Sequence, residues 1–129
     1  MTENDIESYI EYQFKGDILY ARYVPDINIT LERAKLCVEQ RLEYTRDKQV
    51  PVLIDGRQLK SMDKAARDYL SSRDGSRGLL TAALLTDTPL TNFMANFFVK
   101  VNVIKAPFPV RLFTKESEAI KWLKTYQQQ

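Results

Sequence analysis

VPVLIDGR, residues 50–57, carries the clearest strand signal in the sequence. Its first five residues are all apolar, a pattern typical of a short strand buried on both faces of a sheet, and Asp55-Gly56-Arg57 ends it. A second apolar run of this kind covers residues 79–86. Between the two runs, a helix is predicted to begin at the Asp63 cap. Strand, helix and strand in this order predict a right-handed crossover and parallel pairing.

The residues before this stretch predict a hairpin and a helix. Apolar and polar side chains alternate over residues 6–14, residues 18–24 form a second strand, and Lys15-Gly16-Asp17 turns the chain between them. A helical period then begins at the N-cap Thr30. Its inner face is predicted to carry Leu31, Ala34, Val38, Leu42 and Thr45, and its outer face Glu32, Arg33, Lys35, Glu39, Gln40, Arg41 and Glu43. Cys37 is predicted to be a small buried side chain rather than a reactive thiol.

The residues after this stretch extend the alternation of strands and helices. Residues 71–78 are predicted to form a loop, Thr88-Pro89 to start a helix, and residues 110–113 to form a short strand before a last helix capped by Thr114. The glutamines at 127–129 predict a flexible tail. The order ββαβαβαβα predicts an α/β fold, in which a mixed β-sheet begins with an antiparallel hairpin and helices pack on the sheet.

Composition limits the classes of function. A chain of 129 residues with 44% hydrophobic and 28% charged residues predicts one domain over residues 1–129, and a net charge of +2 argues against nucleic acid as a partner. The chain has no histidine and one cysteine, so imidazole bases and clustered cysteine metal sites are excluded and no metal or cofactor is expected. The acidic first residues and the lack of an apolar run of ~20 residues predict a cytoplasmic protein without stable membrane insertion.

Several phrases of the sequence carry a resemblance to a known group. These phrases are Val50-Pro51-Val52-Leu53-Ile54-Asp55, Ala66-Arg67-Asp68-Tyr69-Leu70, Asn96-Phe97-Phe98-Val99-Lys100-Val101-Asn102, Leu112-Phe113-Thr114 and Glu118-Ala119-Ile120-Lys121-Trp122-Leu123. With the element order, they make the chain resemble the bacterial STAS-like proteins of the anti-sigma-factor-antagonist (SpoIIAA-like) superfamily. The likeness is greatest to the small stand-alone "STAS/SEC14 domain-containing" proteins of Bacteroidetes, whose function is uncharacterised.

The resemblance implies a first candidate site at the start of the second helix. Classical members of the superfamily carry an Asp-Ser-Ser-Gly sequence there, and one of its serines is phosphorylated. In this chain Asp63 is followed by Lys64 and Ala65, so the resemblance implies that the phosphorylation switch is lost. Ser61, Asp63 and Lys64 remain candidate partner contacts at a helix start. As an N-cap, Asp63 would also stabilise the helix by ~1 kcal/mol.

Two further candidate sites come from the residues themselves. The predicted helix after Thr88-Pro89 has a wide apolar stripe that includes Phe93, Phe97 and Phe98, which can form core, a docking surface for a partner or a second copy, or the wall of an apolar pocket. A distant resemblance of the superfamily to CRAL-TRIO lipid-binding domains supports the pocket, whereas the shorter length of this chain and the lack of an obvious lid argue against it. Asp55, Arg57 and Asp87 follow the two buried strands, at the sheet edge where open α/β folds tend to place ligands.

Three hypotheses of function follow. The first is a non-enzymatic regulatory or protein-interaction module, whose partner is another protein or a second copy of the chain. The second is a carrier of a small apolar or lipid-like ligand. The third, an enzyme that uses the carboxylates and guanidinium of Asp55, Arg57 and Asp87, is disfavoured because no nucleophile or metal motif accompanies them.

Overall fold

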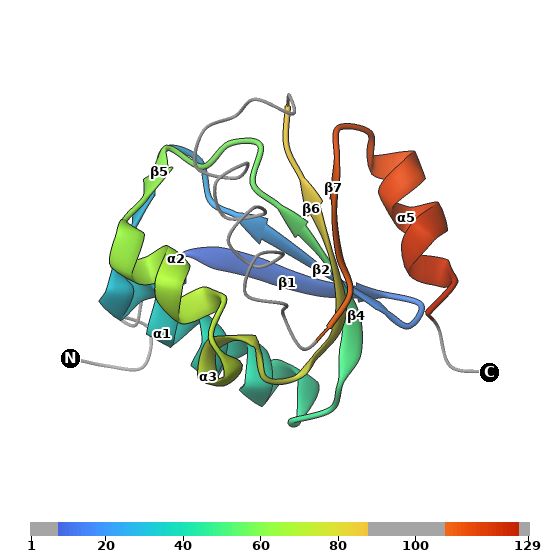
Figure 1. Ribbon diagram of the computed structural model, residues 1–129, viewed down its shortest axis with the longest axis horizontal. Coiled ribbons are helices and arrows are strands. Elements are labelled where there is room, and N and C mark those ends of the chain that lie inside the picture. Colours follow the sequence, from blue (N-terminus) through green and yellow to red (C-terminus); the bar gives the residue numbers. More distant parts are fainter. Residues whose placement is uncertain (1–7, 88–107, 127–129) are drawn as a thin grey trace.

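The computed structural model describes residues 8–87 and 108–126 (Figure 1). The predicted helix after Thr88, with Phe93, Phe97 and Phe98, and the predicted tail at 127–129 lie outside the described residues, as does the beginning of the first predicted strand. The remaining elements follow the predicted order. The main sheet is formed by β1 (Ile10–Lys15), β2 (Ile18–Tyr23), β4 (Val50–Asp55), β6 (Leu79–Leu85) and β7 (Val110–Phe113).

The five strands lie in the order β1-β2-β4-β6-β7, which confirms the predicted mixed sheet. The hairpin of β1 and β2 is antiparallel, and β2, β4, β6 and β7 run parallel to one another. Gly16 has φ +62°, a left-handed conformation that suits the two-residue turn between Lys15 and Ile18. Because β4 and β6 lie in the middle, both faces of these strands are covered, which explains their continuous apolar sequences.

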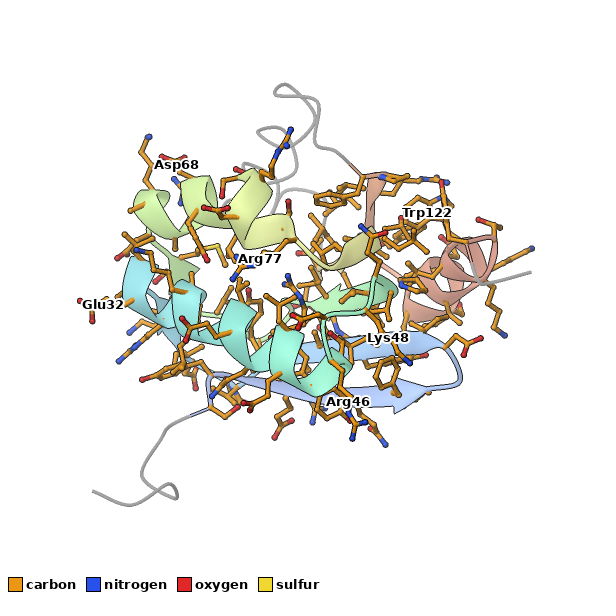
Figure 2. All side chains as sticks on the ribbon, turned by 90° about the horizontal axis from the view of Figure 1, so that it is seen from below. Glu32, Arg46, Lys48, Asp68, Arg77 and Trp122 are labelled. Atoms are coloured by element: carbon orange, nitrogen blue, oxygen red, sulfur yellow. The ribbon has the colours of Figure 1, made fainter. Side chains whose placement is uncertain are left out.

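Helices α1 (Leu31–Thr45) and α2 (Lys64–Leu70) cover one face of the sheet, and α5 (Glu116–Lys124) covers part of the other (Figure 1). Thr30 caps α1 as predicted, since its Oγ1 accepts a hydrogen bond from the Arg33 N–H at 3.2 Å. Glu32 and Arg46, near the two ends of α1, are exposed and are labelled in Figure 2. Fully buried leucines anchor each layer: Leu19 lies under α1, and Leu53 and Leu123 lie between the sheet and α5. Burying each such side chain stabilises the fold by about 1.5–3 kcal/mol.

The structure corrects several details of the sequence-based expectations. Residues 71–78 are not simply a loop, because Ser72 caps a short helix, α3 (Arg73–Ser76). Lys115 rather than Thr114 occupies the N-cap position of the last helix, and its side chain makes no capping hydrogen bond. Two-residue strands β3 (Asn28–Ile29) and β5 (Ser61–Met62) pair in parallel beside the main sheet and were not predicted. Such short pairs have no period that a sequence can reveal.

Arg41 is the largest departure from the predicted faces of α1. The sequence places it on the outer face, but its exposure is 7%. The cause is that α2 and α3 pack along the side of α1, so this helix has a second buried stripe besides the one on the sheet. Arg41 Nη2 donates hydrogen bonds to the carbonyl oxygens of Gly75 (3.5 Å) and Arg77 (2.5 Å), which ties α1 to the end of α3.

Candidate functional site

The second face of the sheet is only partly covered within the described residues. Helix α5 packs on β4, β6 and β7, and the corresponding face of β1 and β2 is left with a groove of about 340 Å³. The groove is floored by the strands and bounded by the first turn of α5. Its lining is rich in charged side chains of both signs: Glu11, Lys15, Arg22, Asp55, Arg57 and Glu116, with Gln13, Tyr20 and Leu53 between them.

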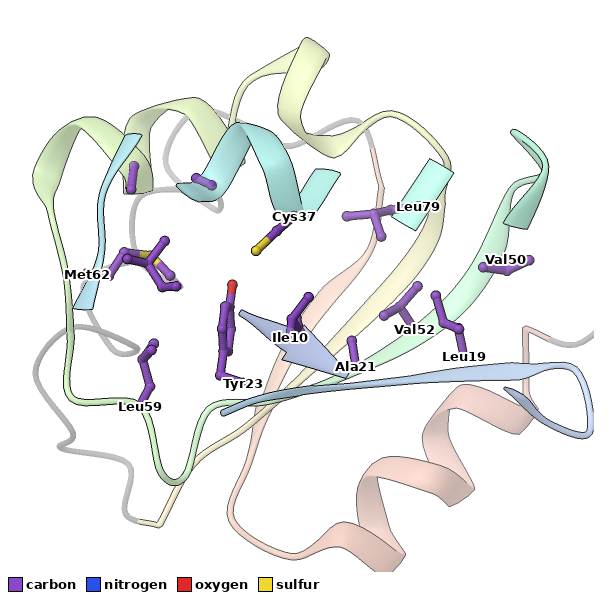
Figure 3. Packing of buried hydrophobic residues seen from close by; sticks show 13 residues of the cluster. Ile10, Leu19, Ala21, Tyr23, Cys37, Val50, Val52, Leu59, Met62 and Leu79 are labelled. Atoms are coloured by element: carbon purple, nitrogen blue, oxygen red, sulfur yellow. The ribbon is translucent and has the colours of Figure 1, made fainter. Parts of the chain in front are cut away.

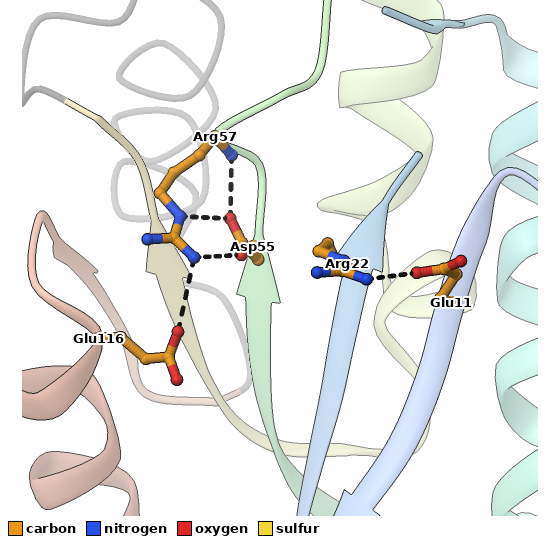
Figure 4. Close-up of polar contacts among 5 residues, drawn as sticks. All are labelled: Glu11, Arg22, Asp55, Arg57 and Glu116. Carbon is orange, nitrogen blue, oxygen red and sulfur yellow. Dashed lines mark hydrogen bonds and ion pairs between the residues drawn. The ribbon is translucent and has the colours of Figure 1, made fainter. Parts of the chain in front are cut away.

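Asp55 and Arg57 of this groove are joined by three hydrogen bonds, and their side chains are drawn in Figure 4. The Arg57 Nε and Nη2 atoms donate to the two carboxylate oxygens of Asp55 at 2.9 and 2.7 Å, and the Arg57 backbone N–H adds a third hydrogen bond at 3.0 Å. Asp55 is buried, with 8% exposure, whereas the Arg57 side chain is 37% exposed. Arg57 also reaches Glu116 Oε1 at 3.5 Å. The hydrogen bonds to Asp55, more than any other contact, raise the pKa of Arg57.

The structure therefore brings together only part of the predicted site of Asp55, Arg57 and Asp87 at the sheet edge. Asp55 and Arg57 are in direct contact, and Asp87 is exposed but near enough for its negative charge to raise the pKa of Arg57 further. The sequence did not reveal Glu116, because it is 59 residues away from Arg57. The Arg57 guanidinium thus contacts the carboxylates of both Asp55 and Glu116. This arrangement can bind a charged group of a partner, and it fixes the orientation of the Arg57 side chain.

The strands β1 and β2 contribute a second set of charges to the groove. Arg22 Nη2 lies 2.8 Å from Glu11 Oε1 across the two strands, and Lys15 Nζ lies 4.3 Å from the centre of the Tyr20 ring (Figure 4 shows the ion pair). The predicted alternation of β1 already placed Glu11 and Gln13 on the solvated side. Because Glu11 and Arg22 are both more than half exposed, this pair contributes little to stability and remains accessible to a partner.

The edge of the sheet beside this groove also carries exposed aromatic side chains. Among the described strands, β1 pairs only with β2, so its other edge is free of a partner strand. On the face opposite the groove, the Tyr44 ring of α1 stacks on Tyr12 (centroids 5.9 Å apart) and Phe14 (5.7 Å). Phe14 and Tyr44 are 38% and 46% exposed, which makes them the largest apolar side chains at this edge that contact solvent.

The candidate residues at the start of α2 lie together at the surface. Ser61 on β5 donates its hydroxyl to Asn28 Oδ1 of β3, so this hydroxyl serves the pairing of the two short strands. Asp63 occupies the N-cap position, but its side chain makes no capping hydrogen bond, and the stabilisation expected from that bond is absent. Lys64 Nζ is exposed and pairs with Asp68 Oδ2 at 3.0 Å.

An apolar cavity of about 50 Å³ lies between the sheet and the helical layer. Figure 3 shows part of its surroundings, with the Tyr23 hydroxyl directed toward Cys37. Tyr12 donates its hydroxyl to the Cys37 carbonyl oxygen at 2.8 Å. Burial raises the pKa values of Tyr12, Tyr23 and Cys37, that of the thiol to about 12. Cys37 is thus buried, as the sequence predicted.

Within residues 8–87 and 108–126, no three side chains of the types that commonly bind metal ions lie together. The helices in the same ranges are all too short or too polar to cross a membrane.

The strand order, the hairpin and the helices on both faces define a SpoIIAA-like α/β domain. The chain belongs to the family described as "Domain of unknown function (DUF7793)", which matches residues 12–127. It is similar in structure to an uncharacterised protein of the DUF3478 family with a SpoIIAA-like fold from Shewanella loihica PV-4. In that comparison the TM-score is 0.59 and the identity 17%, over 88% of this chain and 91% of the other. This likeness confirms the predicted fold.

A second solved structure, a protein with unknown function from Arthrobacter sp. FB24, matches with 24% identity over 95% of this chain and 99% of the other, and a TM-score of 0.32. No curated protein matches the chain.

Proposed function

We propose that this chain is a non-enzymatic protein-interaction module that uses β1 as its docking element. The observation that carries the proposal is the outer edge of β1, which has no partner among the described strands and has exposed aromatic rings on one side and a charged groove on the other. An edge strand can accept a strand from a partner, in which case main-chain hydrogen bonds give affinity and the flanking side chains give specificity. The interaction role matches the regulatory function of the superfamily that the sequence resembles, without the phosphorylated serine.

The backbone of β1 determines which residues a partner strand would meet. The hydrogen bond from Val24 N–H to the Tyr9 carbonyl makes these two residues a hydrogen-bonded pair of the hairpin. Because such pairs alternate along an antiparallel ladder, the N–H and C=O groups of Tyr12 and Phe14 point away from β2. A partner strand would therefore bind through these two residues.

A second copy of this chain is the partner that fits this edge best. If two β1 strands pair antiparallel about Gln13, Tyr12 of one copy lies opposite Phe14 of the other, in the hydrogen-bonded position that their outward backbone groups require. In the same register Glu11 lies opposite Lys15, on the groove side of the sheet. The two Glu11–Lys15 pairs have opposite charges, and the two Tyr12–Phe14 pairs are favourable cross-strand neighbours. Two five-stranded sheets would then join into one continuous sheet.

Charge exchange at this edge tests the proposal. Glu11→Lys and Lys15→Glu each place like charges opposite one another in the proposed dimer, so each variant alone should be monomeric. An equimolar mixture of the two variants pairs Lys with Glu at both positions and should form a heterodimer. Sedimentation velocity over a concentration series measures the molar mass in each case, with the wild type expected to dimerise.

The matched control is Lys124→Glu on α5, which changes the same charge away from β1 and should leave the dimer intact. A wild type that stays monomeric at all concentrations would contradict a β1-mediated homodimer. A dimer that survives both edge variants but is lost with Lys64→Glu would instead place the interface at the predicted site around Ser61, Asp63 and Lys64.

A second candidate function, carriage of a small apolar ligand, is supported by a different observation. The cavity between the sheet and the helices is lined almost entirely by apolar groups, among them Ile10, Val52 and Met62. Its volume of about 50 Å³ suits a few non-hydrogen atoms rather than a long acyl chain. Strand β1 takes part in both functions, because Ile10 and Tyr12 line the cavity, but Glu11 and Lys15 lie on the groove side, so the charge variants test the edge separately from the cavity.

A further inference from the structure

Arg41 is a buried cation beside this cavity, and no acidic side chain among the described residues pairs with it. The charged or ionisable groups that act on it are Tyr12, Tyr23 and Tyr69, and the like charge of Arg77. Its Nη2 atom donates to two backbone carbonyls, but its Nε atom is buried without a hydrogen-bond partner in the described part of the chain. Burying a cation without a counter-ion is costly, and carbonyl dipoles compensate only part of that cost.

The surrounding tyrosines cannot supply the missing negative charge at neutral pH. Burial raises the pKa values of Tyr12 and Tyr23, so both hydroxyls stay protonated. Burial also lowers the pKa of Arg41 from a value so high that the guanidinium keeps its proton. The site that the described residues form therefore contains one positive charge, on Arg41, together with neutral tyrosine hydroxyl groups and apolar walls.

The cavity that Arg41 lines is small and apolar. It has room for roughly three to five water-sized groups, and its walls include Ile10, Val52, Ile54 and Met62. A molecule that fills this space needs a short hydrocarbon part for the walls and an anionic group for the guanidinium. Neither a long lipid nor an inorganic anion meets both requirements.

We propose that this cavity binds a short-chain monocarboxylate, with the hydrocarbon tail among the apolar walls and the carboxylate beside the Arg41 guanidinium. The inference rests on the second candidate function, and it adds the chemical class of the ligand and the residue that recognises it. Charge-assisted hydrogen bonds between guanidinium and carboxylate are strong in a site of low dielectric constant, and they compensate both charges at once.

Three probes of equal chain length test the inference: propanoate, propanamide and propan-1-ol, each with four or five non-hydrogen atoms. Met62 lines the cavity, so the NMR signal of its methyl group in protein labelled at methionine methyls reports occupancy. We expect saturable shifts with propanoate at a dissociation constant at least about tenfold lower than that of propanamide or propan-1-ol, because only propanoate carries a charge for Arg41.

Variants then assign the selectivity to Arg41. Arg41→Gln should bind propanoate no more tightly than propanamide, whereas Arg77→Gln, which removes a nearby but exposed cation, should keep the preference. Retained binding of propan-1-ol shows that the variant cavity is intact. If Arg41→Gln does not fold, the comparison of charged and neutral probes on the wild type decides alone.

The outcomes distinguish a failure of carboxylate recognition from a failure of the carrier function. If all three probes bind the wild type equally, recognition of the carboxylate is overturned while carriage of apolar ligands stands. If none of them moves the Met62 signal, the carrier function and this inference both fail, and the proposed role of β1 is unaffected.

Discussion

Asp55 and Arg57 show how burial increases the contribution of a single ion pair to the free energy of unfolding. Both oxygens of the Asp55 carboxylate are satisfied by the Arg57 guanidinium, and Asp55 is almost inaccessible to solvent. We expect Arg57→Met to lower the free energy of unfolding by about 1–2 kcal/mol, because it leaves a buried carboxylate with only a backbone N–H as donor. The loss is moderate because the guanidinium is 37% exposed. Urea denaturation followed by circular dichroism measures it.

Arg22→Met is the matched control for this prediction. The Arg22–Glu11 pair has the same length, 2.8 Å against 2.7 Å, but both of its side chains are more than 60% exposed. Its loss should leave the free energy of unfolding almost unchanged. Equal losses in the two variants would show that burial of Asp55 is not what makes its ion pair important.

The buried thiol and phenols predict a loss of stability in alkali. Burial raises the pKa of Cys37 to about 12, so above about pH 8.5, where an unfolded thiol ionises, the folded chain holds one more proton than the unfolded chain. The free energy of unfolding is therefore unaffected by Cys37 below about pH 8.5 and falls as the pH rises toward about 12. Tyr12 and Tyr23 add to the fall above about pH 10, because burial raises their pKa values too.

Cys37→Ala separates the thiol from the tyrosines. Between about pH 8.5 and about pH 9.5 the wild type should lose about 1 kcal/mol more than this variant, whatever their difference at neutral pH. Urea denaturation at a series of pH values gives both slopes. Parallel curves for the two proteins would mean that the Cys37 thiol ionises as readily in the folded chain as in the unfolded one.

The candidate sites were predictable only where their residues are near in sequence. Asp55 and Arg57 could be paired because both follow one buried strand. Glu116 could not, because its place depends on how α5 packs on the sheet. Arg41 was placed on the wrong face because a helical period reveals the stripe that faces the sheet, and the stripe that α2 and α3 cover has mixed polarity.

At the scale of elements, long periodic segments were predictable and short ones were not. The sequence predicted every strand of the main sheet and the N-cap positions of α1 and α2, because strand alternation and apolar runs extend over many positions and each capping residue stands directly before a helical period. The short elements α3, β3 and β5 depend on tertiary contacts instead. For example, Asp63 N–H donates to the Ile29 carbonyl, a contact that sets where α2 begins.

Gly75 marks the place where α3 packs closely against the backbone of α2. A Cβ atom at Gly75 would lie 2.0 Å from the Tyr69 carbonyl oxygen of α2, a contact with backbone that no side-chain movement relieves. We expect Gly75→Ala to lower the free energy of unfolding by about 3 kcal/mol. Gly16→Ala is the control, since its Cβ meets open space and only its left-handed backbone costs about 1 kcal/mol. Thermal or urea denaturation should rank the variants in this order, and similar losses would contradict the clash.

At the scale of the whole molecule, the central strands connect two hydrophobic clusters. Val52 of β4 packs in the cluster under α1, and its neighbour Leu53 packs in the cluster under α5. Because successive side chains of a strand point to opposite faces, neither cluster can lose its strands without exposing the other. The two faces, with the proposed ligand cavity on one and the charged groove on the other, should therefore fold as one cooperative unit.

Trp122 makes this cooperativity measurable, because it is the single tryptophan of the chain and lies on α5, against Phe113. Leu19→Ala removes a fully buried side chain from the opposite face, under α1, and should cost about 2–5 kcal/mol. In a cooperative fold this distant change shifts the urea midpoint of Trp122 fluorescence as far as the midpoint of far-ultraviolet circular dichroism. If the fluorescence midpoint stays at its wild-type value while the circular dichroism midpoint falls, α5 and its cluster unfold independently of the α1 face.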